Sequence, residues 1–413
     1  MQRIHTHEYD NGLKLLVEPH QGVASCGLTW LLPAGVVCEP PGGHGTCTLL
    51  SELMFRGAGD RDARAHSDAL DGLGVQRSTE AQPWHLALQA TMMGARLPEA
   101  LPLLVDMVSS PHLDADAFEP TRQLALQSLE ALEDDPQEKV IVELKERFLG
   151  DPLGRSVYGR GEDLRALAVE DVRAFKQHQL VPHGAILGVA GAVDFPAVRD
   201  LVGRLLDGWS GDVDLPEARC SGPGGHHHVP AETAQEHIGV AHFAPAEPDP
   251  QSMVQRLGIA VLSGGMSGRL FTEVREKRGL CYAVHAMYAA GKEIGAVLAY
   301  AGSTPQQAPE TLEVLVEQLQ GISEGVTPDE FQRAVVGLKS RLVMQGESTS
   351  ARAAAIARDQ YLLDHPRTLD EIATAVDAIT VDQLNAFLAG HRPDRFTTLA
   401  LGPQPLAAPV PAG

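Results

Sequence analysis

The sequence predicts an α+β protein of two homologous domains, each a mainly antiparallel sheet with helices packed on one face, joined by a linker. Three observations favour this class. The 413 residues exceed one ordinary domain of about 150 residues. A Gly/Pro-rich break lies near the middle, and the segments on its two sides resemble each other. Strand-like and helical runs also mix without the strict alternation of a parallel α/β sheet.

The break covers residues 220–230, where Gly and Pro stop a helix or strand from continuing. We therefore place an N-terminal domain at 1–217, a linker at 218–234 and a C-terminal domain at 235–406. Residues 407–413 offer little to pack, so we expect a disordered tail there.

The two halves share amphipathic helical patterns. Residues 99–108 parallel residues 310–319, and residues 116–118 parallel residues 329–331 at nearly the same offset. Each of the latter segments opens a further long helical pattern. Strand-like runs occur in both halves, at residues 27–32, 185–190, 238–243 and 295–300. Matches at nearly one offset indicate a duplicated domain.

Composition and charge exclude several classes of protein. The chain is 44% hydrophobic and 21% charged, which is typical of a globular protein, and it has no long unbroken apolar run. With 33 Lys and Arg against 54 Asp and Glu, the net charge is −21, so nucleic acid and anionic membranes are poor partners. The five cysteines form no metal-binding spacing and the start lacks a signal sequence, which predicts a cytoplasmic protein.

The most informative segment is residues 263–282, in which a glycine turn leads into a charged helix that ends at Gly279 as a C-cap. This segment resembles the C-terminal-domain signature of the pitrilysin/insulinase family of metallopeptidases, in its processing-peptidase-like branch. Residues 149–155 and Glu133-Asp134-Asp135-Pro136 agree with the resemblance, which covers nearly the entire chain.

The resemblance implies two homologous α+β domains, and two such chains closing as a clamshell around a chamber that digests unfolded peptides. Active members carry an inverted zinc motif, H-x-x-E-H, on an N-terminal helix. Two histidines at i and i+4 share one helix face and bind zinc, while the glutamate deprotonates the metal-bound water.

In this chain the zinc motif is degenerate. The family reads G-T-x-H-x-x-E-H-M-x-F-K-G, and the matching segment is residues 45–57. Thr48 and Glu52 stand at the histidine positions, Ser51 at the base, and Ser128 at the remaining ligand. Two hydroxyls and one carboxylate cannot form a catalytic zinc site. We therefore expect no metal in this chain and no activity alone.

Other histidines do not replace the motif. His44, His66 and His85 lie in the same half without the paired spacing of the motif, so we interpret them as surface or structural residues. The run His226-His227-His228 could chelate a metal. In a Gly/Pro linker its side chains point in different directions, which favours incidental capture.

The C-terminal signature, by contrast, is intact. The resemblance implies that Arg275 and Tyr282 reach the zinc site of another domain or subunit, and that Gly264, Gly265 and Met266 form a loop that contacts substrate. A guanidinium and a phenol are suited to holding a peptide carbonyl and stabilising its oxyanion. Alternatively, Arg275 pairs with Glu273 or Glu276, Tyr282 belongs to the core, and the glycines form an ordinary turn.

These observations favour a zinc-free subunit of a heterodimeric zinc peptidase. Its partner would be a homologous H-x-x-E-H subunit that holds the zinc, and its substrates unfolded peptides. Two alternatives stay open: a structural or scaffold homologue without a peptidase role, and a self-contained homodimer with a non-standard metal site.

Overall fold

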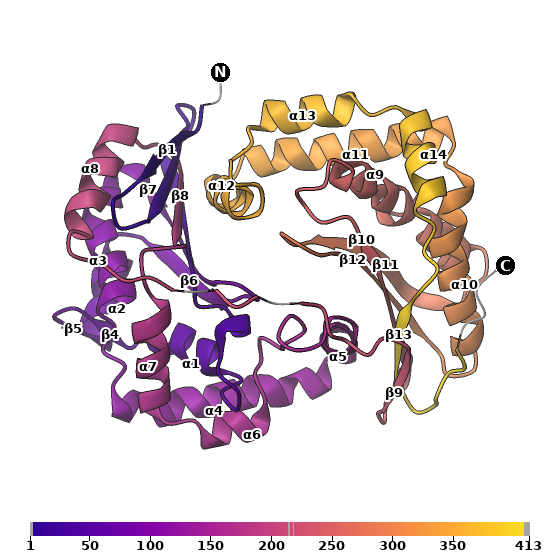
Figure 1. Cartoon of the computed structure of the whole chain (residues 1–413), viewed down its shortest axis with the longest axis horizontal. Helices are drawn as coiled ribbons and strands as arrows, with labels where there is room; N and C mark the ends of the chain where they lie inside the picture. The colour runs from indigo at the N-terminus through magenta and orange to yellow at the C-terminus, as the bar shows by residue number, and fades with distance from the viewer. Residues whose placement is uncertain (1–2, 214, 218, 409–413) are drawn as a thin grey trace. The chain divides into compact units, whose positions relative to one another are not determined.

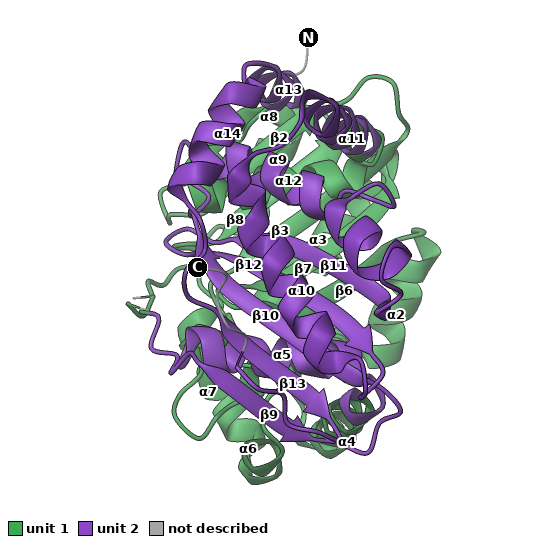
Figure 2. Ribbon diagram, turned by 90° about the vertical axis from the view of Figure 1, so that its right-hand side faces the viewer, with its two compact units in different colours: residues 1–131, 155–219, 345–368 green, residues 132–154, 220–344, 369–413 purple. Residues whose placement is uncertain are grey.

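The computed structural model describes residues 3–213, 215–217 and 219–408, so residues 409–413 of the predicted tail lie outside the described part. The chain forms two compact units (Figure 2). Unit 1 comprises residues 1–131, 155–219 and 345–368, and unit 2 comprises residues 132–154, 220–344 and 369–413. Neither unit is contiguous. The bounds 1–217 and 235–406 therefore separate the halves of the sequence and do not coincide with the compact units.

Unit 1 contains a six-stranded sheet in the order β1-β2-β8-β3-β7-β6. Neighbouring strands are antiparallel except β2 and β8, which are parallel. The strands are β1 His5–Glu8, β2 Lys14–Pro19, β3 Ser25–Leu32, β6 Gln76–Ala81, β7 Leu86–Met93 and β8 Ile186–Gly191. A small separate pair is formed by β4 Gly57–Ala58 and β5 Arg61–Asp62. The central strands β3 and β8 are almost wholly buried, as their continuous apolar runs require.

Unit 2 contains a five-stranded sheet in the order β11-β12-β10-β13-β9, with β13 and β9 parallel and the other pairs antiparallel. Its strands are β9 His226–Pro230, β10 Glu236–Ala244, β11 Cys281–Ala290, β12 Gly295–Ser303 and β13 Thr397–Gly402. Apart from β1, every strand of the first sheet has a counterpart at the same place and in the same relative direction. The duplicated, mainly antiparallel α+β fold is thus confirmed.

Most helices cover one face of each sheet and enclose the two largest apolar cores. In unit 1 these are α1 Thr46–Leu53, α2 Ala63–Gly72, α3 Leu97–Ser109, α4 Ala115–Ala131, α6 Gly161–Ala166, α7 Val169–Gln179 and α8 Phe195–Leu205. In unit 2 they are α9 Ser252–Ser263, a π-helix at Phe271–Glu276, α10 Ala308–Gly321, α11 Pro328–Gly346, α13 Leu369–Asp377 and α14 Val381–Gly390.

The second face of each sheet carries one helix that comes from the other half of the sequence (Figure 1). In unit 1 this helix is α12, Thr349–Leu363, which packs on β3 and β8. In unit 2 it is α5, Pro136–Leu149, which packs on β10 and β13. The halves thus exchange equivalent helices, and each exchanged helix gives its sheet a second, smaller apolar core.

Glycines allow α12 to approach the first sheet closely. A Cβ atom on Gly27 of β3 would lie 2.5 Å from the backbone of Thr349, and one on Gly188 of β8 would lie 2.5 Å from the carbonyl oxygen of Ala353. A buried ion pair of Arg352 with Glu18 of β2, 2.8 Å apart, also fixes the helix. Because these contacts involve main chain, the packing has little room to adjust.

Part of the predicted linker is regular structure. Residues 226–230 form β9, an edge strand paired with β13. No helix within the described ranges is long and apolar enough to cross a membrane.

Candidate functional site

Helix α1 carries the degenerate motif, and its N-terminus is held by a side chain that the sequence did not reveal. One carboxylate oxygen of Glu39 accepts hydrogen bonds from the backbone N–H groups of Gly45 at 3.1 Å and of Cys47 at 2.8 Å. Glu39 is 3% exposed. Burial raises its pKa to about 8, against the opposing effect of the two N–H donors and Arg155. Nothing in the segment Glu39-Pro40-Pro41-Gly42-Gly43 distinguishes such a cap from an ordinary turn.

The hydroxyls of the motif bind main-chain oxygens. Thr48 donates to the carbonyl oxygen of Val157 at 2.6 Å, and Ser51 donates to the carbonyl oxygen of Thr48 at 2.8 Å. Ser51 is buried, whereas Glu52 is exposed to solvent. The two hydroxyls therefore stabilise α1 and its neighbours.

Helix α4 contacts α1, as the resemblance to the family requires. Ser128 lies on α4, is exposed, and donates its hydroxyl to the carbonyl oxygen of Leu124 at 3.0 Å. The two helices that would carry a zinc site are therefore adjacent. At the four positions of the zinc motif, however, they carry three hydroxyls and one carboxylate. This donor set does not fit a catalytic zinc ion, which takes three protein ligands drawn from histidine, cysteine and carboxylate side chains.

The other histidines of the N-terminal half have structural contacts. His44 lies 3.7 Å from Asp163, and His66 bonds the carbonyl oxygen of Leu103 at 3.1 Å. His85 packs edge-on against Tyr361, and burial lowers its pKa to about 3. Across the residues that the structure places, no three His, Cys, Asp or Glu side chains gather as a metal site would need.

The histidine triplet lies on strand β9. His226 bonds the hydroxyl of Thr398 at 2.5 Å, His227 bonds the carbonyl oxygen of Gly224 at 2.7 Å, and His228 bonds that of Gly402 at 3.0 Å. The predicted linker is a strand at these residues, because pairing with β13 extends the chain. Successive side chains of a strand point to opposite faces, so the three imidazoles do not converge.

The Arg275 and Tyr282 side chains lie together in unit 2. The π-helix that carries Arg275 ends in a turn at Gly279, whose φ of +61° suits glycine, and β11 begins directly afterwards. The guanidinium carbon of Arg275 lies 5.1 Å from the ring centre of Tyr282 and 4.8 Å from that of Phe271. Arg275 thus lies over both aromatic rings in cation–π contacts.

The geometry does not match the alternative in which Arg275 pairs with a neighbouring glutamate and Tyr282 belongs to the core. Glu273 pairs with Lys277 at 2.6 Å, and Arg275 forms no ion pair with any residue in the described ranges. Tyr282 is 76% exposed and so does not belong to the core. Among the described residues, the structure therefore presents a guanidinium without an ion pair beside an exposed phenol.

The predicted substrate loop follows α9 and is exposed over Gly264, Gly265 and Met266. Gly265 has a φ of +150° and its Cβ position faces open space, whereas Met266 is 72% exposed. An exposed methionine on a glycine turn is an adaptable apolar contact.

Comparison with known proteins identifies the family. Residues 15–161 match the family model described as Insulinase (Peptidase family M16), and residues 166–338 match the one described as Peptidase M16 inactive domain. An uncharacterized zinc protease of Streptomyces coelicolor is 28% identical over 92% of this chain and 86% of its own. Another, of Bacillus subtilis, is 23% identical over 91% of this chain and 92% of its own.

Solved structures agree in fold. A peptidase M16 inactive domain from Pseudomonas fluorescens superposes with a TM-score of 0.88 at 19% identity, over 99% of this chain and 100% of that one. A protease from Helicobacter pylori gives a TM-score of 0.88 at 19% identity, over 97% and 100%. The chain belongs to the insulinase-like M16 peptidase family. Without the histidines and glutamates of the family motif, it is a non-zinc-binding member.

Proposed function

We propose that this chain is the zinc-free subunit of a two-chain peptidase, and that it supplies Arg275 and Tyr282 to the zinc site of a homologous H-x-x-E-H partner. The observation that carries this proposal is the exposed pair itself. Cation–π contacts with Phe271 and Tyr282 hold the guanidinium in place without using its N–H groups. Those donors therefore stay available for a ligand.

The chemistry suits the carbonyl of a peptide bond. The partner's site would supply the metal-activated water, and this chain the hydrogen-bond donors. The N–H groups of Arg275 and the hydroxyl of Tyr282 would donate to the carbonyl oxygen, which becomes negatively charged as the carbon is attacked. The exposed loop at Gly264–Met266 would contact the same extended peptide.

The two alternatives have less support. A purely structural subunit has no need of a solvent-exposed Tyr282 beside a guanidinium that lacks an acidic partner among the described residues. A self-contained homodimer with its own metal would need a cluster of ligands, and the part of the chain that the structure describes contains none.

The test is reconstitution. The chain is co-expressed with the H-x-x-E-H member of the family from the same genome, and cleavage of an internally quenched, unstructured peptide is measured. We expect activity only in the mixture. Arg275→Ala and Tyr282→Phe should each lower kcat by a factor on the order of 100, the typical effect of removing an oxyanion donor.

Matched controls separate catalysis from assembly. Arg278→Ala removes a neighbouring arginine, 35% exposed, whose distance to Glu317 is 3.9 Å, and should leave kcat unchanged. Light scattering should show the same stoichiometry for all complexes. If the Arg275 and Tyr282 variants cleave at the parent rate in intact complexes, the proposed roles are wrong.

A further inference from the structure

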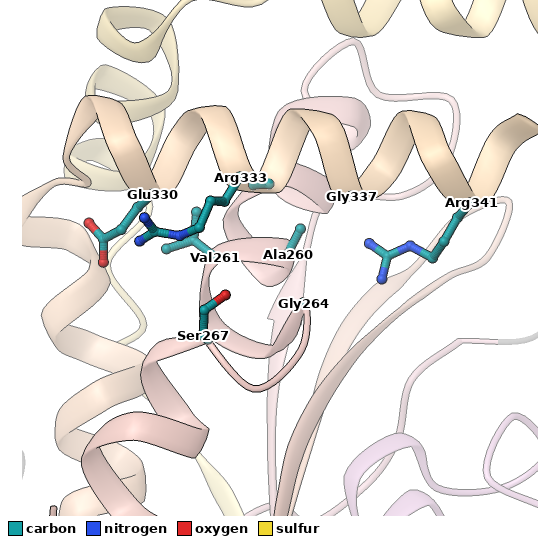
Figure 3. A pocket seen from close by; sticks show the side chains of 10 residues that line it. Ala260, Val261, Gly264, Ser267, Glu330, Arg333, Gly337 and Arg341 are labelled. Carbon is teal, nitrogen blue, oxygen red and sulfur yellow. The ribbon is translucent and has the colours of Figure 1, made fainter. Parts of the chain in front are cut away.

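A pocket in unit 2 lies between α11 and the C-terminal end of α9 with its glycine turn (Figure 3). It is a shallow pocket, whose space of about 340 Å³ includes open solvent. The α9 side contributes Gly264 and Ser267, and α11 contributes Arg333, Gly337 and Arg341. Both arginine side chains project from α11 toward the side on which Gly264 and Ser267 lie.

The pocket carries uncompensated positive charge. Its one lining carboxylate, Glu330, accepts hydrogen bonds from Arg269 at 2.6 and 2.9 Å, which with those from Thr327 lower its pKa to about 2. Glu330 is therefore ionised, and Arg269 already balances its negative charge. Arg333 and Arg341 form no ion pair or hydrogen bond with any described residue. Two free guanidinium groups at one pocket favour an anionic ligand, and they do so in a chain whose net charge is −21.

Gly337 keeps the space between these arginines open. Arg333, Gly337 and Arg341 are spaced four residues apart on one face of α11. No positive φ requires glycine at 337, and a Cβ atom there would touch nothing within 4 Å. Glycine inside a helix costs about 1 kcal/mol relative to alanine. An alanine Cβ atom would therefore fit at 337, whereas a longer side chain would enter the space between the two arginines that glycine leaves open.

The duplication places this pocket at the counterpart of the lost zinc site. Phe118 of α4 corresponds to Phe331 of α11, and at the same spacing Ser128 corresponds to Arg341 and Leu124 to Gly337. In element order α9 likewise corresponds to α1. The helix pair that bears the motif in unit 1 thus bears two arginines and a glycine in unit 2.

We propose that this pocket binds a carboxylate group of a peptide, either an acidic side chain or a free C-terminus. We choose a peptide over a small inorganic anion because exposed methionines adjoin the lining residues along the chain: Met266 precedes Ser267, Met344 lies three residues after Arg341, and each is 72% exposed. Met344 shares the helix face of Gly337. The inference rests on the proposed peptide-binding role but requires neither Arg275 nor a partner chain.

The test measures binding of fluorescent, unstructured peptides to the full chain by anisotropy. One peptide carries an internal glutamate and an amidated end, a second has glutamine there and a free C-terminus, and a third has glutamine and an amidated end. We expect the third to bind about tenfold or more weakly, because charge-assisted bidentate contacts are lost. The tighter of the first two identifies the source of the carboxylate.

Variants of the lining residues show where the peptide binds. The difference in affinity between the peptides should disappear in each of three variants: Arg341→Gln, Arg333→Gln and Gly337→Leu. Gly337→Ala should retain the difference in affinity and raise the unfolding temperature. Replacing this glycine therefore does not by itself unfold the protein. Lys339→Gln, which removes a cation paired with Asp377 at 2.7 Å, should change nothing.

Four results would overturn the proposal. They are equal affinity for all three peptides, absence of binding, a difference in affinity that survives both Arg341→Gln and Gly337→Leu, and displacement by inorganic phosphate without any discrimination between peptides. Because binding is measured on the chain alone, the outcome is independent of whether Arg275→Ala impairs a complex.

Discussion

Thr48 shows how a position of the zinc motif has acquired a structural role. Its hydroxyl joins α1 to the carbonyl oxygen of Val157, far along the chain. Thr48→Val should destabilise the protein by about 1 kcal/mol, because the carbonyl loses its donor. Thr48→Ser keeps the hydroxyl and should be closer to the parent. Urea unfolding measures both; equal stability of the valine variant and the parent would contradict this role.

Glu39 gives a second prediction, on pH. Its folded-state pKa of about 8 exceeds the unfolded value of 4.5, so the folded state favours the neutral form. The resulting stability is fully present below pH 4.5 and is lost as the pH rises through 8. Glu39→Gln stays neutral, and its side-chain oxygen can still accept from Gly45 and Cys47.

Free energies of unfolding for this variant and its parent should therefore diverge with pH. The variant should gain on the parent by about 1–3 kcal/mol between pH 5 and pH 9. Comparing the two proteins cancels the titration of groups that they share. Parallel curves across this range would show that the carboxyl ionises in the folded state as readily as in the unfolded chain.

For single residues, the sequence predicted a role where the residue belongs to a recognisable motif. Thr48, Ser51 and Glu52 could be placed because the flanking residues fix the alignment of the motif. The structure adds that the hydroxyls of Thr48 and Ser51 donate to main-chain oxygens. Glu39 belongs to no pattern. Its role arises from burial and from two N–H groups that only the folded chain brings to it.

At the scale of elements, the exchange of α5 and α12 was not predictable. An amphipathic pattern shows that a helix buries one face, but not which sheet covers it. Apolar runs indicated four of the strands, β3, β8, β10 and β12, and the matching order of the two sheets follows from duplication. Close packing of α12 depends on glycines of β3 and β8, whose spacing carries no such signal in the sequence.

Gly27→Ala tests the docking of α12. The new Cβ atom would lie 2.5 Å from the backbone of Thr349 and Ser350, which cannot rotate away as a side chain can. We expect a loss of about 1–3 kcal/mol in urea unfolding and faster proteolysis within residues 345–368. Gly72→Ala, whose Cβ would touch nothing within 4 Å, should not destabilise the protein. If both alanine variants behave alike, α12 adapts to the added methyl group.

For the whole molecule, duplication has let two equivalent helix pairs diverge. In unit 1, α1 and α4 keep the arrangement of the family and lack its metal ligands. In unit 2, α9 and α11 line a pocket with free arginines, and the Arg275 and Tyr282 pair of the family signature is exposed. Under the proposed function, such a chain would bind a peptide whose cleavage depends on another subunit.

Metal content tests this division of roles. Tag-free protein purified without added metal should contain well below one zinc per chain by elemental mass spectrometry, because two hydroxyls and an exposed Glu52 replace the ligands on α1. A chelator should leave the unfolding temperature unchanged. Replacing His226, His227 and His228 with alanine controls for incidental capture. One tightly held zinc per chain that survives this replacement would mean that other residues build a metal site, and would favour the alternative of a self-contained enzyme.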